Sequence, residues 1–159
     1  MEGKMENKQM QDLINTAIQR EEEAYEFYMD ILNRVEDQSA RDTLEFIAGE
    51  EKKHRDFLVA YRDGDYGADA LRMNDPVDFK IAEHLEEPKV EDEMRSKDIY
   101  LIAAHRELRA YNFYTELANL HPEGELYELL RKVASEELKH KEKMEYLYAN
   151  TAFPQTAGG

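Results

Sequence analysis

The sequence contains no cysteine among its 159 residues. A chain without thiols cannot form disulfide bonds, thiolate zinc sites or an iron site with four cysteine ligands, and it has no cysteine nucleophile. It also lacks any run of about 20 apolar residues, the length that a membrane-spanning helix needs. The first residues, Met1–Leu13, lack the apolar stretch of a secretory signal. We therefore expect a cytoplasmic protein with no membrane partner.

Basic residues are in the minority. The chain has 21 Lys and Arg against 36 Asp and Glu, which gives a formal net charge of −15. Such a surface repels nucleic acid and anionic lipid, so we expect neither as a partner. Part of this acidity can belong to an internal site instead of the surface.

Glycine and proline are also scarce, with 7 and 4 residues. The long stretches without a helix breaker predict an all-α fold. No segment alternates between polar and apolar residues over any length, so we expect no sheet. A short helix is expected between Pro76 and Pro88. The long helices are predicted over about residues 8–35, 39–62, 93–120 and 123–150.

The predicted helices form two long hairpins linked by a crossover of about 30 residues, over about residues 63–92. This connection predicts a four-helix bundle with one long crossover between helices two and three, since an up-down-up-down bundle needs only short loops. We expect a single domain over about residues 1–150, followed by a frayed tail over about residues 151–159.

The two hairpins repeat one another in sequence. The segment "QREEEAYEFY" (Gln19–Tyr28) matches "HRELRAYNFY" (His105–Tyr114) at six of ten positions, at an offset of 86 residues. At the same offset, "AGEEKKH" (Ala48–His54) matches "ASEELKH" (Ala134–His140) at five of seven positions. The chain is therefore predicted to be a duplicated helical hairpin folded about a pseudo-twofold axis.

Each long helix carries one glutamate within its apolar stripe, and two helices add a histidine one turn later. Four carboxylates in a bundle core repel one another and are costly to desolvate unless something neutralises them. Two divalent cations would balance the four negative charges, and two neutral imidazoles would complete the coordination. Carboxylate and imidazole suit two iron ions, with manganese or zinc as alternatives. The predicted metal ligands are Glu21, Glu51, His54, Glu107, Glu137 and His140.

A bundle that has lost its metal and keeps these glutamates as hydrogen-bonded pairs is the alternative interpretation. Tyr28 and Tyr114 lie seven residues after Glu21 and Glu107 and share their helix faces. Each hydroxyl is expected to donate to a ligand carboxylate, or to be redox-active near the metals. The other interpretation is a core aromatic residue whose hydroxyl is satisfied elsewhere.

On these motifs the sequence resembles the ferritin-like superfamily, nearest to rubrerythrin-related proteins, over all four helices. The resemblance implies Glu21 and Glu107 as terminal or bridging carboxylates, together with the two Glu-x-x-His pairs. Rubrerythrins have a further glutamate on the third helix, one turn from the first, where this chain has Ala104 and Ala110. The chain also has no cysteine-rich rubredoxin domain, so the usual electron route of that family is absent from it.

The resemblance implies an oxidoreductase whose di-iron centre reduces H₂O₂ or O₂, or oxidises Fe(II), with an unknown electron donor. Two alternatives stay open: an iron-handling protein, and a non-enzymatic helical bundle with a vestigial or zinc-filled site. We also expect a homodimer, because four phenylalanines outside the stripes exceed what one bundle seam requires. These are Phe27, Phe46, Phe57 and Phe113.

Overall fold

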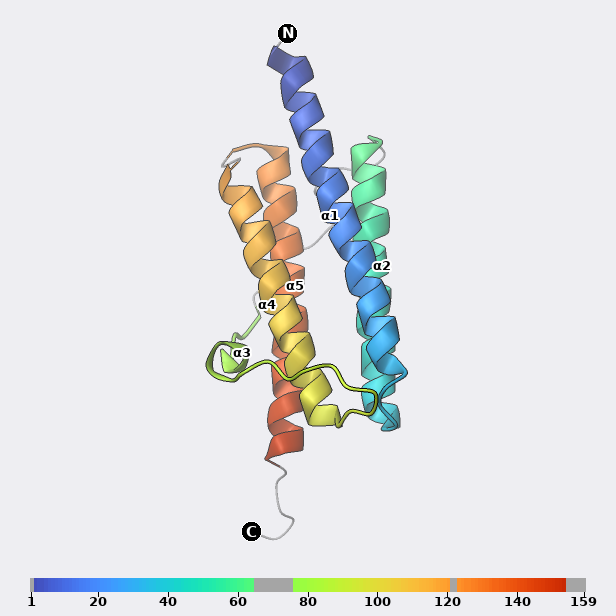
Figure 1. Ribbon diagram of the computed structural model, residues 1–159. Helices are drawn as coiled ribbons and strands as arrows, with labels where there is room; N and C mark the ends of the chain where they lie inside the picture. The colour runs from blue at the N-terminus through green and yellow to red at the C-terminus, as the bar shows by residue number, and fades with distance from the viewer. Residues whose placement is uncertain (1, 65–75, 121–122, 154–159) are drawn as a thin grey trace.

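The computed structural model describes residues 2–64, 76–120 and 123–153. Helices are the regular elements over these residues, with no strand among them, which confirms the predicted all-α class (Figure 1). In chain order they are α1 (Glu2–Leu32), α2 (Gln38–Arg62), α3 (Ile81–His84), α4 (Ser96–Leu120) and α5 (Glu125–Ala152).

The helix bounds differ from the prediction by several residues at some ends. Helix α1 begins at Glu2, six residues earlier than predicted. Helix α3 has only four residues, because Lys80 before it adopts a left-handed conformation with φ of 54° that interrupts the helix. Helix α5 continues to Ala152, and residues 154–159 of the predicted frayed tail lie outside the described residues.

Side-chain contacts close the turn between α1 and α2. The Asp37 carboxylate accepts the backbone N–H of Ala40 at 3.1 Å and so caps the first turn of α2. The Arg41 guanidinium donates to the carbonyl groups of Leu32 and Val35, which are left without helical partners at the end of α1. The chain therefore reverses direction, and α2 packs antiparallel to α1.

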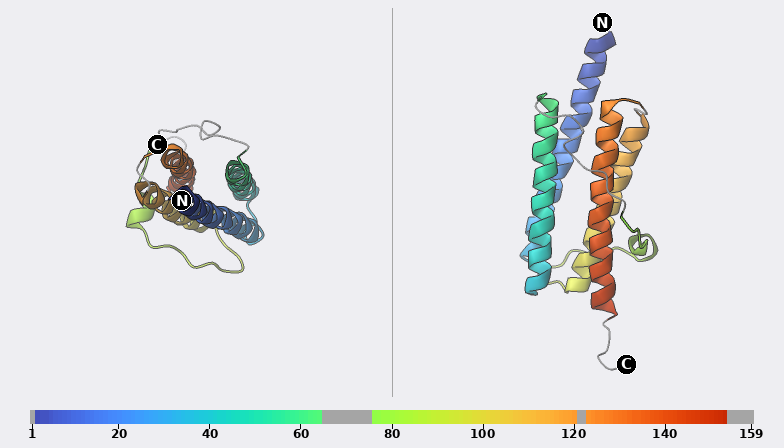
Figure 2. Two further views of the ribbon diagram at one scale, coloured as in Figure 1. Left: turned by 90° about the horizontal axis from the view of Figure 1, so that it is seen from above. Right: turned by 180° about the vertical axis from the view of Figure 1, so that it is seen from behind.

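The crossover returns the chain to the turn between α1 and α2. The backbone N–H of Met94 donates to the Arg34 carbonyl at 2.8 Å, and the Arg34 guanidinium donates to the Glu91 carbonyl. Helix α4 consequently starts beside that turn and runs in the same direction as α2, while α5 returns alongside it (Figures 1 and 2). This connectivity is that of the predicted ferritin-like bundle.

The crossover is held against α5 by a buried cation. The Lys141 side chain is fully buried, and its Nζ lies 2.6 Å from Asp78, 2.8 Å from Glu83 and 3.1 Å from Glu145. Glu145 also accepts the backbone N–H of Ala82 at 2.8 Å. These contacts keep the crossover on one side of the bundle.

The apolar core is divided into two clusters along the bundle. One includes Ile14, Leu58 and Leu130, and the other includes Ile31 and Leu44. Each fully buried Leu or Ile stabilises the fold by about 1.5–3 kcal/mol. The glutamates and histidines of the predicted site are buried between the two clusters, so the apolar packing on both sides holds them in place.

The homodimer was expected because of four phenylalanines, and only one of them is strongly exposed. Phe57 is a core residue, and Phe27 and Phe113 are half-buried under arginine side chains. Phe46 is 52% exposed. The homodimer thus stays a prediction, and of the four phenylalanines it is supported mainly by the exposed Phe46. No helix among the described residues is long and apolar enough to cross a membrane.

Candidate metal centre

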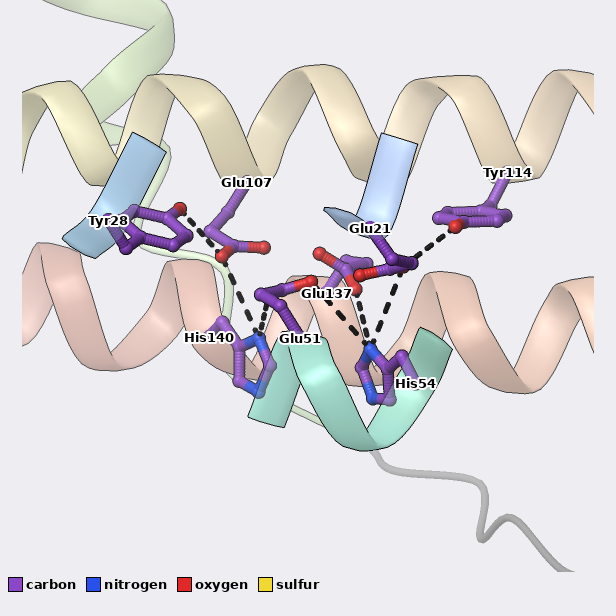
Figure 3. Close-up of polar contacts among 8 residues, drawn as sticks. All are labelled: Glu21, Tyr28, Glu51, His54, Glu107, Tyr114, Glu137 and His140. Carbon is purple, nitrogen blue, oxygen red and sulfur yellow. Dashed lines mark hydrogen bonds and ion pairs between the residues drawn. The ribbon is translucent and has the colours of Figure 1, made fainter. Parts of the chain in front are cut away.

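The structure brings the six predicted ligands together at mid-length of the bundle (Figure 3). Glu21 comes from α1, and Glu107 comes from α4. The two Glu-x-x-His pairs come from α2 and α5, where the three-residue spacing puts both side chains on one face. All six side chains are buried, with exposed fractions between 1% and 4%.

The six residues form two overlapping groups, in each of which the candidate ligand atoms lie within 4.8 Å of one another. Glu51 and Glu137 belong to both groups. Glu21 and His54 complete one group, and Glu107 and His140 complete the other. The geometry thus distinguishes two shared carboxylates from two that each serve one group, a choice that the sequence left open.

The histidines contact carboxylates of the opposite hairpin. His54 Nδ1 lies 2.9 Å from Glu137 Oε1, and His140 Nδ1 lies 3.0 Å from Glu51 Oε1. The two imidazole rings stack with centroids 5.6 Å apart. Each Nδ1 atom therefore faces the carboxylates, on one side of the cluster (Figure 3).

The two tyrosine hydroxyls also reach across the bundle. Tyr28 donates to Glu107 Oε1 at 2.8 Å, and Tyr114 donates to Glu21 Oε1 at 2.7 Å. Each tyrosine was expected to donate to a ligand carboxylate, and the structure shows that this acceptor is the glutamate of the other hairpin. Burial and the nearby carboxylates raise the pKa of both phenols well above the usual value, so they stay protonated donors.

Burial and mutual repulsion act on the carboxyl groups. They raise the pKa of Glu21, Glu51 and Glu137 well above the ordinary value. Burial also opposes ionisation of Glu107, but hydrogen bonds with Glu137 and His140 outweigh it and lower the pKa of Glu107 to about 2. The shifts thus favour the protonated forms of Glu21, Glu51 and Glu137 and the ionised form of Glu107.

The pKa values of the two histidines shift in opposite directions. Burial lowers the pKa of His54. Burial also acts against the charged form of His140, but the contacts with Glu107 outweigh it and raise its pKa. Neutral His54 is thus available as a nitrogen donor, the form in which imidazole binds metals.

Three buried carboxylate oxygens at the centre have no hydrogen-bond partner among the described residues. They are Oε2 of Glu21, Glu51 and Glu107. Burying an acceptor without a partner costs about 1–3 kcal/mol, and a metal ion would satisfy these atoms. Oxygen donors combined with two imidazoles are typical of iron, manganese or zinc sites. The residues present thus fit bound metal ions.

Residues 2–61 match the sequence model of the rubrerythrin family. The match covers α1 and nearly all of α2, with Glu21, Tyr28, Glu51 and His54. The N-terminal hairpin is therefore similar to rubrerythrin, and the bundle topology is ferritin-like. No curated protein and no solved structure matches the chain.

The site also includes residues that the sequence interpretation missed. A cavity of about 170 Å³ lies against the carboxylates, and Arg20 and Arg106 line it. Both arginines belong to the repeated segments, at the offset of 86 residues. The repeat could therefore have identified both arginines. They were not selected because a cationic side chain does not bind a metal ion.

Proposed function

We propose that the protein holds two iron ions between its hairpins and acts as an oxidoreductase on H₂O₂ or O₂. The supporting observation is the pair of overlapping ligand groups that share Glu51 and Glu137. Two divalent ions would balance four carboxylates, and one imidazole lies in each group. When bound, a pair of ferrous ions supplies two electrons to a single oxidant molecule.

The side chains of this protein would position the two metal ions. Glu51 and Glu137, which belong to both groups, would help to hold both ions, while Glu21 and Glu107 would each help to hold one. Tyr28 and Tyr114 orient the two terminal carboxylates by donating to one oxygen of each. The apolar clusters on both sides keep bulk water from the site, which strengthens every electrostatic interaction within it.

Oxidation of Fe(II) as a substrate is the second candidate activity. His140 also lies in a further group with the half-buried Glu50 and Glu136, and these residues line a surface groove of about 480 Å³. An acidic path to the centre would favour an iron-handling role. We prefer the reduction of peroxide or oxygen, because the symmetric ligands favour a resident pair of ions.

An anaerobic Fe(II) titration of the metal-free protein tests the proposal. We expect two tight equivalents per chain, lost in Glu51→Ala and in His140→Ala. Glu45→Ala is the matched control, because Glu45 is an exposed carboxylate on α2. Circular dichroism establishes that each variant remains helical. Absence of saturable binding by the wild-type chain would overturn the dinuclear site.

The loaded protein then separates the two activities. With H₂O₂ under anaerobic conditions, a peroxide-reducing centre consumes about one peroxide per two ferrous ions and keeps its iron. With O₂ and excess Fe(II), a ferroxidase turns over many equivalents and releases ferric ions. A chain that binds iron and does neither would support the non-enzymatic alternative.

A further inference from the structure

The cavity beside the carboxylates lies between α1 and α4 and is built from repeat-related pairs. Its twelve lining residues form six pairs at the offset of 86, so the cavity straddles the pseudo-twofold axis. Ala24 and Ala110 form one pair, and their small side chains leave the space open. Neither histidine lines the cavity, so it opens on the side of the carboxylates away from the imidazoles.

Two arginines of this cavity have no carboxylate partner among the described residues. The Arg20 guanidinium lies 3.9 Å from the ring centroid of Phe113, and that of Arg106 lies 4.3 Å from the centroid of Phe27. Among the described residues neither forms an ion pair, although the chain has 36 acidic residues against 21 basic ones. The buried Nε atom of Arg106 also lacks a hydrogen-bond partner there. These guanidinium groups are therefore available to an acceptor that the described part of the chain does not supply.

The repeat includes this arrangement as well as the metal ligands. Arg20 corresponds to Arg106, and Phe27 corresponds to Phe113. Each arginine stacks on the phenylalanine of the other hairpin, so both guanidinium groups are held across the gap between α1 and α4. Metal binding by carboxylate and imidazole does not require these residues. Their duplicated geometry indicates a role of their own.

The charge at the cavity selects the class of ligand. With two divalent ions bound, the four glutamates at its floor sum to zero with the metals. Arg109 is neutralised by Glu87, at 2.9 Å and 3.0 Å. Arg20 and Arg106 then face only Glu23 among the remaining lining charges, which leaves a net positive rim. A positive, partly enclosed cavity attracts an anion.

We infer that this cavity is a binding site for one small inorganic anion, held by the guanidinium groups of Arg20 and Arg106 beside the metal pair. The inference rests on the proposed dinuclear centre. The guanidinium group presents several N–H donors in a fixed plane, which suits a small anion with more than one acceptor atom. A volume of about 170 Å³ accommodates such an anion together with water.

Azide binding to the zinc-loaded protein tests the inference without any redox step. Zinc content per chain is measured first, and the azide dissociation constant is then measured by calorimetry. We expect saturable azide binding that weakens about tenfold or more in the double variant R20Q/R106Q, because the variant loses the charge-assisted hydrogen bonds to the anion. The single variants R20Q and R106Q should each show a smaller loss, and they keep the test available if the double variant does not fold.

Arg131→Gln is the matched control. Arg131 also stacks on an aromatic ring, that of Tyr127, but it does not line the cavity. Its substitution changes the net charge equally and should leave azide affinity within about twofold. Azide affinity unaffected by the cavity variants, or absent with two zinc ions bound, overturns the anion site alone. A chain that takes up no zinc overturns the metal pair and the anion site with it.

Discussion

Single carboxylates at the centre have opposite effects on the metal-free and the metal-loaded protein. Glu51 is 1% exposed, and its pKa is raised by burial and by Glu107. In the absence of metal, its charge is a cost that the rest of the fold must offset. With metal, the same carboxylate belongs to both ligand groups. Such a residue lowers the stability of the metal-free fold and is retained for a role in binding.

Replacing Glu51 by glutamine is expected to stabilise the metal-free protein and weaken its response to metal. The neutral amide has no ionised form that must be desolvated beside Glu107, so the melting temperature of the metal-free chain should rise by a few degrees, equivalent to about 1 kcal/mol. The rise on adding Zn²⁺ or Fe(II) should largely disappear. Thermal unfolding with and without metal measures both effects, with Glu45→Gln as the control. A metal-free variant that melts below wild type would contradict the expectation.

The tyrosine hydroxyls are expected to contribute to metal affinity through the carboxylates that they contact. Tyr28→Phe and Tyr114→Phe each remove one hydrogen bond to a terminal glutamate. We expect about tenfold weaker metal binding, and a loss of about 1–3 kcal/mol in the unfolding free energy of the metal-free chain. Competition with a zinc chelator measures the affinity. Tyr25→Phe, in the half-buried part of the same helix, should change neither quantity.

At the scale of elements, α5 connects the site to the crossover. His140 faces the metal ligands, while the next residue, Lys141, binds the crossover through Asp78 and Glu83. Successive residues of a helix point about 100° apart, so α5 can serve both neighbours at once. The buried charges of Lys141 and Glu145 compensate one another, and removal of one partner leaves the other uncompensated.

The variant Lys141→Met is expected to destabilise the protein by about 3 kcal/mol. This is the lower end of the range for breaking a buried ion pair, since two of the three partners are partly exposed. The double variant Lys141→Met/Glu145→Gln should recover part of the loss, because the second buried charge is removed as well. Urea denaturation measures the unfolding free energy. Lys139→Met, on the exposed face of α5, should stay within about 0.5 kcal/mol of wild type.

At the scale of the whole molecule, the buried polar layer couples stability to pH and to metal. The raised pKa values of Glu21, Glu51 and Glu137 mean that the folded chain holds these protons more tightly than the unfolded chain. This contribution is fully present below the unfolded value of 4.5 and is lost as the pH rises through the raised values. Glu107 acts oppositely, since its contribution is lost as the pH falls toward about 2.

The metal-free protein should therefore melt at a lower temperature at about pH 8 than at about pH 5.5. The metal-loaded protein should show the reverse order, because metal ions bind the deprotonated carboxylates and bind more tightly as the pH rises. Calorimetric melting over this range, with the metal content fixed, measures both trends. The variant Glu51→Gln/Glu137→Gln should flatten the metal-free trend. A metal-free melting temperature that increases with pH would exclude this account of the core.

The sequence by itself determined the helical class, the duplicated hairpin and the presence of six potential ligands on apolar stripes. Helical periodicity accounts for this success, because spacing along one helix places residues such as Glu51 and His54 on one face. The family match over residues 2–61 agrees with that interpretation. The ligand roles themselves remain predictions for metal titration to test.

Only the tertiary structure decided which faces meet. It paired Tyr28 with Glu107 of the other hairpin, and it placed Phe27 beneath Arg106. It also assigned Lys141 to the crossover. The periodicity of a helix specifies the direction of a side chain about its own axis, but not its height against a neighbouring helix. The position of a side chain along the neighbouring helix is decided by how the two hairpins pack around the four carboxylates.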